Sequence, residues 1–146
     1  MQTTKPLTII NAEELILGRM ASVIAKRLLN GEEIVIVNAE KAVLSGKKKS
    51  KVAEAKEFLK VGSPKMGPFH PRRPDRIVRR TVRGMLPYKQ PKGKQAYKRL
   101  RVFIGLPEEF KNQKMETIET AQANKLACPY FTIGEFAKEL GWNPGE

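Results

Sequence analysis

Cysteine and histidine are almost absent from this sequence, which has one of each in 146 residues, Cys128 and His70. A lone cysteine cannot form a disulfide within the chain and is compatible with a reducing compartment, so we expect Cys128 to be a small core residue. One side chain of each type cannot supply the four Cys or His ligands of a structural zinc site. We therefore expect a fold that depends on neither a disulfide nor a metal, and no cofactor.

Long hydrophobic runs are also missing. No stretch approaches the roughly 18 apolar residues that a transmembrane helix needs. The first six residues, MQTTKP, contain no apolar core of a signal peptide. We therefore expect a soluble protein that is not exported, works in the cytoplasm and has no membrane partner.

Motifs for catalysis and nucleotide binding are incomplete. Gly18 lacks the neighbouring glycines of G-x-G-x-x-G, and the SGKK segment at 45–48 lacks two phosphate-loop residues, because Lys41 and Lys48 occupy the Gly and Ser/Thr positions. His70 lies in a basic segment interrupted by prolines, where we favour a stacking, phosphate-contacting or exposed role over general-base catalysis. The basic region has too few acidic residues for a magnesium site held by carboxylates. We therefore expect no enzymatic activity and no small-molecule substrate.

Negative charge is scarce in one part of the chain, where basic residues are dense. The whole sequence has 28 Lys and Arg against 15 Asp and Glu, a formal net charge of +13. Residues 47–101 hold 19 of the basic residues and 3 acidic ones, whereas the rest of the chain holds 9 and 12. A run of charge is often only a solvated surface, but a surplus this concentrated favours a polyanionic partner, and we predict nucleic acid.

Inside this basic region, residues 74–87 are predicted to form a helix with one cationic face and one apolar face. At about 100° per residue, four arginines fall within an arc of roughly 100°. Pro74 and Asp75 suit the first turn of a helix, and Gly84 and Pro87 mark its end. The cationic face comprises Arg76, Arg79, Arg80 and Arg83, and the other side comprises Ile77, Val78, Thr81, Val82, Met85 and Leu86. Because clustered arginines repel one another, we expect an anion to face this stripe.

The N-terminal part of the sequence predicts a parallel βαβ unit. Residues 7–10 and 34–38 are short apolar runs typical of buried strands. Between them, apolar residues recur at helical spacing from Leu17 onward, until Gly31 ends the pattern. Two parallel strands joined by a crossover helix are expected from this order. The next segment, 42–46, either extends this sheet or turns away from it.

The basic region itself alternates predicted helices with irregular segments. A helix begins at the lysine run 47–51 and has an apolar side that includes Val52 and Phe58. Residues 63–73 contain three prolines and are expected to form an extended arm. After the arginine helix we expect a basic loop at 87–94, a short helix at 95–100 and a strand at 101–105.

The C-terminal part is patterned more weakly. Residues 108–122 are expected to be a loop with one helical turn. Thr132 is predicted to cap a final helix, because Glu135 follows three residues later as in a capping box. Gly141 is expected to end this helix.

Aromatic rings are interleaved with the basic charge at Phe69, Tyr88 and Tyr97. Flat rings can stack on unpaired bases, and ordinary core packing is the alternative role. We favour core packing for Tyr97, which lies at the edge of a predicted helix. Both roles stay open for Phe69 and Tyr88.

Four separated blocks of the sequence also occur together in a known family. In chain order the blocks are LGRMASVIAKRLLNG (17–31), IVIVNAEK (34–41), RTVRGMLP (80–87) and RLRVFIG (99–105). Together they resemble the universal large-subunit ribosomal protein thirteen family. The segment GPFHPRRP at 67–74 is more similar to the archaeal and eukaryotic branch than to the bacterial branch. The resemblance covers about residues 7–107 and is loose in the tail.

This resemblance implies a three-layer α/β/α fold with a central, mostly parallel sheet of about four strands, carrying basic loops and a C-terminal helical extension. We expect a single domain over 1–146, with an RNA-facing region at 47–101 and an extension at 108–146. The resemblance further implies a non-catalytic, structural role in the large ribosomal subunit. There the family binds ribosomal RNA, supports subunit assembly and has other ribosomal proteins as neighbours.

On the matching positions, the resemblance places RNA contacts at Arg80, Arg83, Lys89 and Arg99. We extend the predicted RNA-binding set across the basic region. The full set is Lys47, Lys48, Lys49, Lys51, Lys65, His70, Arg72, Arg73, Arg76, Arg79, Arg80, Arg83, Lys89, Lys92, Lys94, Lys98, Arg99 and Arg101. Composition alone leaves open a DNA-compacting or regulatory nucleic-acid-binding protein. A small nucleotide-dependent enzyme is the other alternative, and the missing phosphate-loop glycines argue against it.

Overall fold

Three parallel strands form the main sheet of the structure, a computed structural model that describes residues 7–144. The strands are β1 (Leu7–Asn11), β2 (Glu33–Val37) and β4 (Leu100–Val102), in the spatial order β1-β2-β4. Helix α1 (Leu17–Leu29) connects β1 to β2, and the two strands are parallel, so the predicted βαβ unit is confirmed. The central strand β2 is apolar and buried almost throughout, as expected of a strand covered on both faces.

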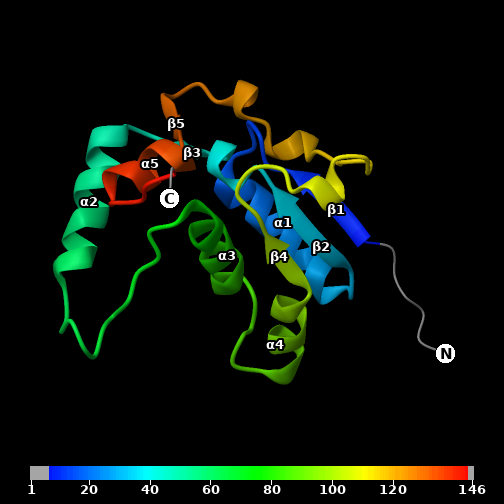
Figure 1. The fold of residues 1–146 in the computed structure, drawn as a ribbon, viewed down its shortest axis with the longest axis horizontal. Helices are drawn as coiled ribbons and strands as arrows, with labels where there is room; N and C mark the ends of the chain where they lie inside the picture. The colour runs from blue at the N-terminus through cyan, green and yellow to red at the C-terminus, as the bar shows by residue number, and fades with distance from the viewer. Residues whose placement is uncertain (1–6, 145–146) are drawn as a thin grey trace.

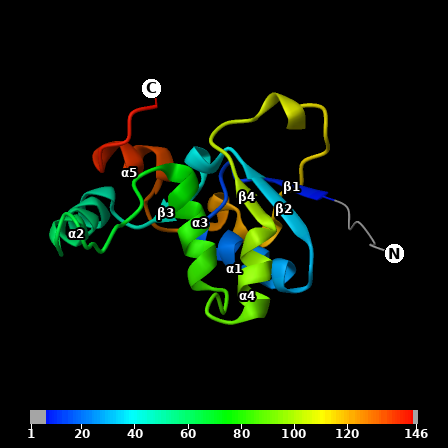
Figure 2. The same cartoon turned by 60° about the horizontal axis from the view of Figure 1, so that its bottom comes forward.

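Helices cover one face of this sheet (Figures 1 and 2). They are α1, α3 (Pro74–Gly84) and α4 (Pro91–Lys98), and α1 contacts both of the others. Their apolar side chains meet those of the strands in the largest core cluster. Val78 and Val82 of α3 are fully buried in this cluster, which confirms the predicted apolar face of the arginine helix. Met85, expected on the same side, is 44% exposed, whereas Leu86 beside it is buried in the core.

The other face of the sheet is covered by residues 103–116, which run above the strands in Figure 2. Ile9 and Val35 on this face pack against Phe110, which lies in a single 3-10 turn, η2 (Glu108–Phe110). The α/β class with a mostly parallel sheet is therefore confirmed. The fold has three layers, which are helices α1, α3 and α4, the main sheet, and the segment 103–116 on the other face of the sheet.

A second, two-stranded sheet lies beside the first. It pairs β3 (Val43–Ser45) with β5 (Tyr130–Thr132) in antiparallel register. After β2, Asn38 has a positive φ of 57° and a 3-10 turn, η1 (Ala39–Lys41), redirects the chain. The segment 42–46 therefore turns away from the main sheet, and the strands divide into three and two instead of forming one sheet of about four.

The last helix, α5 (Ile133–Glu139), follows β5 directly. The backbone N–H of Glu135 donates a hydrogen bond to the hydroxyl oxygen of Thr132 at 3.2 Å, which confirms the predicted N-cap. The prediction that Cys128 lies in the core was wrong, because the irregular chain just before β5 runs over the surface and leaves the thiol exposed. Residues 108–122 hold two short 3-10 turns, η2 and η3 (Glu119–Ala121), instead of one.

Helix α2 (Lys48–Lys60) stands apart from the sheet and packs against α5 (Figure 1). Val52 of its predicted apolar side is buried, but Phe58 is 54% exposed. An irregular arm, residues 61–73, then leads to α3, as the prolines predict. The arm runs from the end of α2 to the start of α3 and lies between these two helices (Figure 1).

Helix α4 begins at Pro91, four residues before the helix predicted at 95–100, and β4 begins at Leu100. Proline suits the first turn of a helix because its missing N–H would have no partner there. Gly93 is buried at this point, where the chain folds back so tightly that a Cβ atom would overlap the carbonyl oxygen of Pro87. The tight turn brings α4 alongside the end of α3.

We expect Gly93→Ala to lower the free energy of unfolding by about 1–3 kcal/mol, because the added methyl group pushes α4 away from the turn before it. Gly84→Ala is the matched control, since nothing lies within 4 Å of its Cβ position. Alanine there is expected to be neutral or to stabilise by up to about 1 kcal/mol. Thermal melts measure both, and a Gly93→Ala melt equal to that of the wild type would contradict this packing.

Candidate nucleic-acid interface

The arginines of α3 line one concave surface. Because α3 buries Val78 and Val82 against the core, its opposite side faces out, toward the arm. A groove of about 660 Å³ lies between α3, residues 69–72 of the arm, Tyr97 of α4 and Val102 of β4. We call it the arginine groove. Its α3 lining includes Asp75, Arg76, Arg79, Arg80 and Arg83, so the structure brings the four predicted arginines together.

Two of these guanidinium groups stack on tyrosine rings. The guanidinium carbon of Arg79 lies 4.4 Å from the ring centroid of Tyr97, and that of Arg83 lies 4.7 Å from the centroid of Tyr88. Such cation–π contacts hold a guanidinium in one orientation and stabilise it by about 0.5–2 kcal/mol. Tyr97 also packs against the main core, which confirms its predicted core role. Its contact with Arg79 was missed, because 18 residues separate the pair in the sequence.

The α3 arginines have no carboxylate partner within residues 7–144. The ion pairs of the described chain involve Arg27, Lys48 and Arg73, and the nearest carboxylate in sequence, Asp75, pairs with Arg73 at 3.4 Å. The Nε atoms of Arg79 and Arg83 are buried and make no hydrogen bond in the described structure. These two cations have therefore lost part of their hydration without gaining an anion, which is unfavourable unless an external anion binds.

The outer wall of the groove is formed by the arm. Phe69 is 71% exposed although it is a large apolar residue, and His70 beside it is exposed as well. The ring of His70 lies 5.9 Å from that of Phe58 on α2. An exposed phenyl ring next to four arginines is suited to stack on a flat, anionic ligand such as an unpaired nucleotide.

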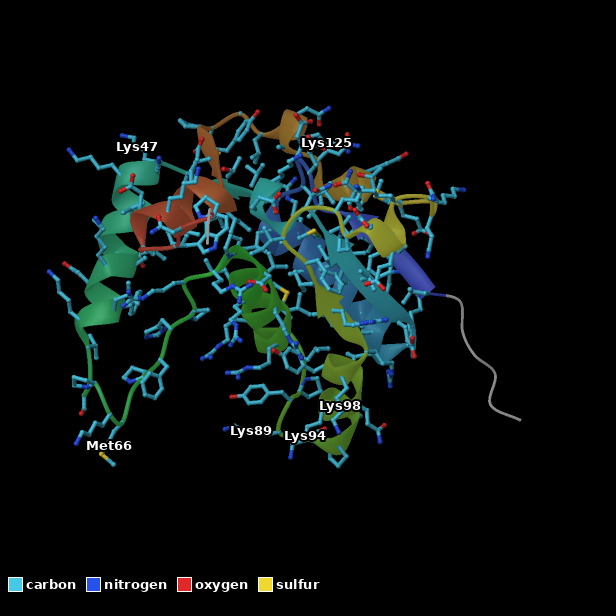
Figure 3. All side chains as sticks on the ribbon, viewed as in Figure 1. Lys47, Met66, Lys89, Lys94, Lys98 and Lys125 are labelled. Atoms are coloured by element: carbon cyan, nitrogen blue, oxygen red, sulfur yellow. The ribbon has the colours of Figure 1, made fainter. Side chains whose placement is uncertain are left out.

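Other predicted RNA contacts lie on separate parts of the surface. In Figure 3, Lys47 marks one end of the molecule, at the start of α2, whereas Lys89, Lys94 and Lys98 cluster around α4. The lysines around α4 extend the cationic surface of the arginine groove beyond Tyr88, which follows the end of α3. Away from the groove, the structure exposes Lys47 just before α2, Lys48, Lys49 and Lys51 on α2, Lys65 on the arm, and Lys89, Lys92, Lys94 and Lys98 around α4. Lys48 also lies 4.0 Å from the carboxylate of Glu139.

Two further predicted contacts, Arg99 and Arg101, also lie outside the arginine groove. Arg99 is partly buried and donates a hydrogen bond from Nη1 to the backbone carbonyl of Leu28 at 2.8 Å, near the C-terminal end of α1. Basic side chains are favoured at this end of a helix, so Arg99 has a structural task. Arg101 pairs in register with Val35, whose side chain lies on the sheet face opposite to α3. Successive side chains of a strand point to opposite faces of the sheet. Because Leu100 and Val102 are apolar and point to the core, this alternation could have predicted that Arg101 points to the other face.

Two other kinds of feature are absent from the residues that the structure describes. Within residues 7–144 there is no group of three or more His, Cys, Asp or Glu side chains arranged to hold a metal ion. No helix in that range has the length and apolar character needed to cross a lipid bilayer.

Comparisons with known proteins agree with the family resemblance. A model of the family described as ribosomal protein L13 matches residues 5–109. Large ribosomal subunit protein uL13 of Archaeoglobus fulgidus is 51% identical over 137 residues, which are 92% of this chain and 88% of that protein. The uL13 protein of Methanococcoides burtonii is 48% identical over 136 residues, 92% of this chain and 98% of that protein. The chain therefore belongs to the ribosomal protein L13 family.

Proposed function

We propose that this chain is a structural, non-enzymatic component of the large ribosomal subunit that binds ribosomal RNA through the arginine groove. The large-subunit role predicted from the sequence is confirmed by the family, whose relatives are named large ribosomal subunit proteins. One observation supports the arginine groove as the RNA-binding surface. Four α3 arginines line this single groove and have no carboxylate partner in the part of the chain that the structure describes.

Phosphate groups suit this groove for chemical reasons. A guanidinium group presents a planar fork of N–H donors that binds two phosphate oxygens at once, and the charge-assisted hydrogen bonds are strong. Four such groups within one groove neutralise neighbouring phosphates, so RNA segments that would otherwise repel each other pack closely around α3. The lysines around α4 extend this contact along the RNA, and the lysines at the start of α2 make a second contact.

The residues outside the groove receive different roles in this proposal. Arg99 supports the end of α1, and Arg101 meets RNA or a neighbouring ribosomal protein on the far face of the sheet. The chain acts as one RNA-binding domain over 1–146, with its RNA-facing region at 47–101. The extension at 108–146 is part of the same domain, since Phe110, Ile118 and Ile133 pack in its core clusters, and the site of action is the ribosome in the cytoplasm.

Salt dependence tests the proposed function. If the protein neutralises about six to ten phosphates, its affinity for in vitro transcribed large-subunit ribosomal RNA of Archaeoglobus fulgidus falls by about 10³ to 10⁵ between 50 and 200 mM salt. Filter binding across that range measures the slope, and duplex DNA added as competitor is expected to displace little RNA. Equal competition by duplex DNA would favour a general nucleic-acid-compacting protein and contradict the proposal.

A further inference from the structure

We propose that the arginine groove holds one unstacked nucleotide of the RNA, with its base on the ring of Phe69 and its phosphate on Arg79 and Arg83. This inference rests on the proposed RNA-binding function and deepens it by naming what enters the groove. The groove brings an exposed aromatic ring and the four α3 arginines together on one open concave surface, which suits a base and its phosphate at the same time.

The size of the groove fits a single nucleotide. Its volume of about 660 Å³ falls within the range of about 300–1,000 Å³ that is typical of small-ligand pockets. The groove has α3 along its length, the arm on one side and Tyr97 with Val102 on the other. A base turned out of its stack can enter between these walls, whereas a paired duplex remains at the mouth of the groove.

The arm places Phe69 at the groove without burying it. Ser63 and Gly67 exchange two backbone hydrogen bonds, of 3.1 and 3.0 Å, which close the arm into a tight turn. Gly67 has a positive φ of 83°, and a Cβ atom there would lie 3.1 Å from the Phe69 ring. The ring therefore rests against its own backbone turn, and 71% of the residue stays exposed. An apolar ring that is positioned by a turn and left open to solvent is suited to stack on a base.

The phosphate end of the groove is organised in advance. Tyr97 and Tyr88 hold the guanidinium groups of Arg79 and Arg83 by stacking, and the buried Nε atoms of both arginines have no hydrogen-bond partner in the described structure. The two arginines are one helical turn apart on α3, so both forks point to the same region. Because their orientation is already restricted, little side-chain freedom is lost when a phosphate binds. Tyr97 and Tyr88 are positioning residues for this contact.

The test compares single-stranded and duplex RNA on the full-length chain. Fluorescence anisotropy at about 50 mM salt would measure binding of a labelled ten-nucleotide single strand and a ten-base-pair duplex of the same sequence. We expect Phe69→Ala to weaken single-strand binding by about 10-fold and duplex binding by about 2-fold at most, because stacking on unpaired bases contributes about 1–3 kcal/mol per base. Phe69→Trp is expected to restore single-strand binding, since a larger ring keeps the stack.

Two control variants distinguish the groove from the rest of the surface and the base contact from the phosphate contact. Tyr130→Ala removes another exposed ring, on β5 and outside the groove, and is expected to change neither affinity. The salt slope of Phe69→Ala is expected to equal that of the wild type because no charge is lost, whereas Arg79→Ala is expected to reduce the slope by about 1. Both results would support a base on Phe69 and a phosphate on Arg79.

The outcomes that overturn the inference differ from those that overturn the proposed function. If the wild type binds both RNAs and Phe69→Ala binds them equally well, no base stacks on Phe69, and the inference is overturned while the proposed function stands. Free 5′-AMP that binds as tightly as the single strand would show a mononucleotide site and also overturn the inference. A wild type that binds neither RNA would overturn the proposed RNA-binding function itself, and the inference with it.

Discussion

Replacing Arg76 and Arg80 together with glutamate is expected to lower the affinity for large-subunit ribosomal RNA by about 100-fold or more. Both side chains are exposed and line the arginine groove, so each is available to a phosphate. A hydrogen bond to a charged group contributes about 1.5–3 kcal/mol, and two such losses correspond to about 10² to 10⁴ in affinity. The fold should be retained, because α3 is held by Val78 and Val82 on its other side.

The measurement is RNA binding at about 0.1 M salt, with the transcript of Archaeoglobus fulgidus large-subunit RNA as the probe. The matched control is Lys111→Glu with Lys114→Glu, which changes the net charge by the same amount at exposed positions outside the basic region. We expect this control to lose about 3-fold at most, through the weaker overall attraction alone. Equal losses for the two double variants would mean that net charge, and not the groove, decides RNA binding.

Val82→Asp is expected to have the largest effect on stability. Val82 is fully buried in the main core, where α3 meets the sheet and α1. An unpaired carboxylate there costs about 3–5 kcal/mol, a large part of the roughly 5–15 kcal/mol that stabilises a domain. A loss of this size lowers the melting temperature by about 10–20 °C or removes the cooperative transition altogether.

The same substitution at an exposed valine is the control for this prediction. Val61 lies just after α2 and is 61% exposed, so Val61→Asp leaves its carboxylate in water. We expect it to shift the melting temperature by about 3 °C or less, measured by circular dichroism at neutral pH. A Val82→Asp variant that melts like the wild type would contradict the orientation of α3, and with it the placement of the arginine groove.

Local sequence patterns correctly predicted those structural features that depend on residues close together in the sequence. The faces of α3 follow from a repeat of 3.6 residues, so the arginines could be assigned to one side and the valines to the other before any packing was known. The same holds for α1, whose apolar spacing is buried as expected, and for the N-cap at Thr132, where donor and acceptor are three residues apart. These features require no knowledge of distant parts of the chain.

The groove itself could not be predicted in this way. A cationic helix face becomes a concave site only because residues 69–72 of the arm, Tyr97 of α4 and Val102 of β4 line the same groove. Arg99 illustrates the same limit, since its partner carbonyl on Leu28 is 71 residues away. Arg101 is different, because the alternation of side chains along β4 is a local pattern that could have predicted its place on the opposite face of the sheet.

The sequence by itself determined the family, the βαβ unit and the gathering of positive charge on one side of α3. Only the tertiary structure decided that β3 leaves the main sheet to pair with β5, and that Tyr88 and Tyr97 hold Arg83 and Arg79. The physical reason is the sequence separation over which each interaction acts. Periodicity and capping act over one or two turns of chain, whereas a strand partner or a stacked ring is chosen by packing between segments that lie far apart in sequence.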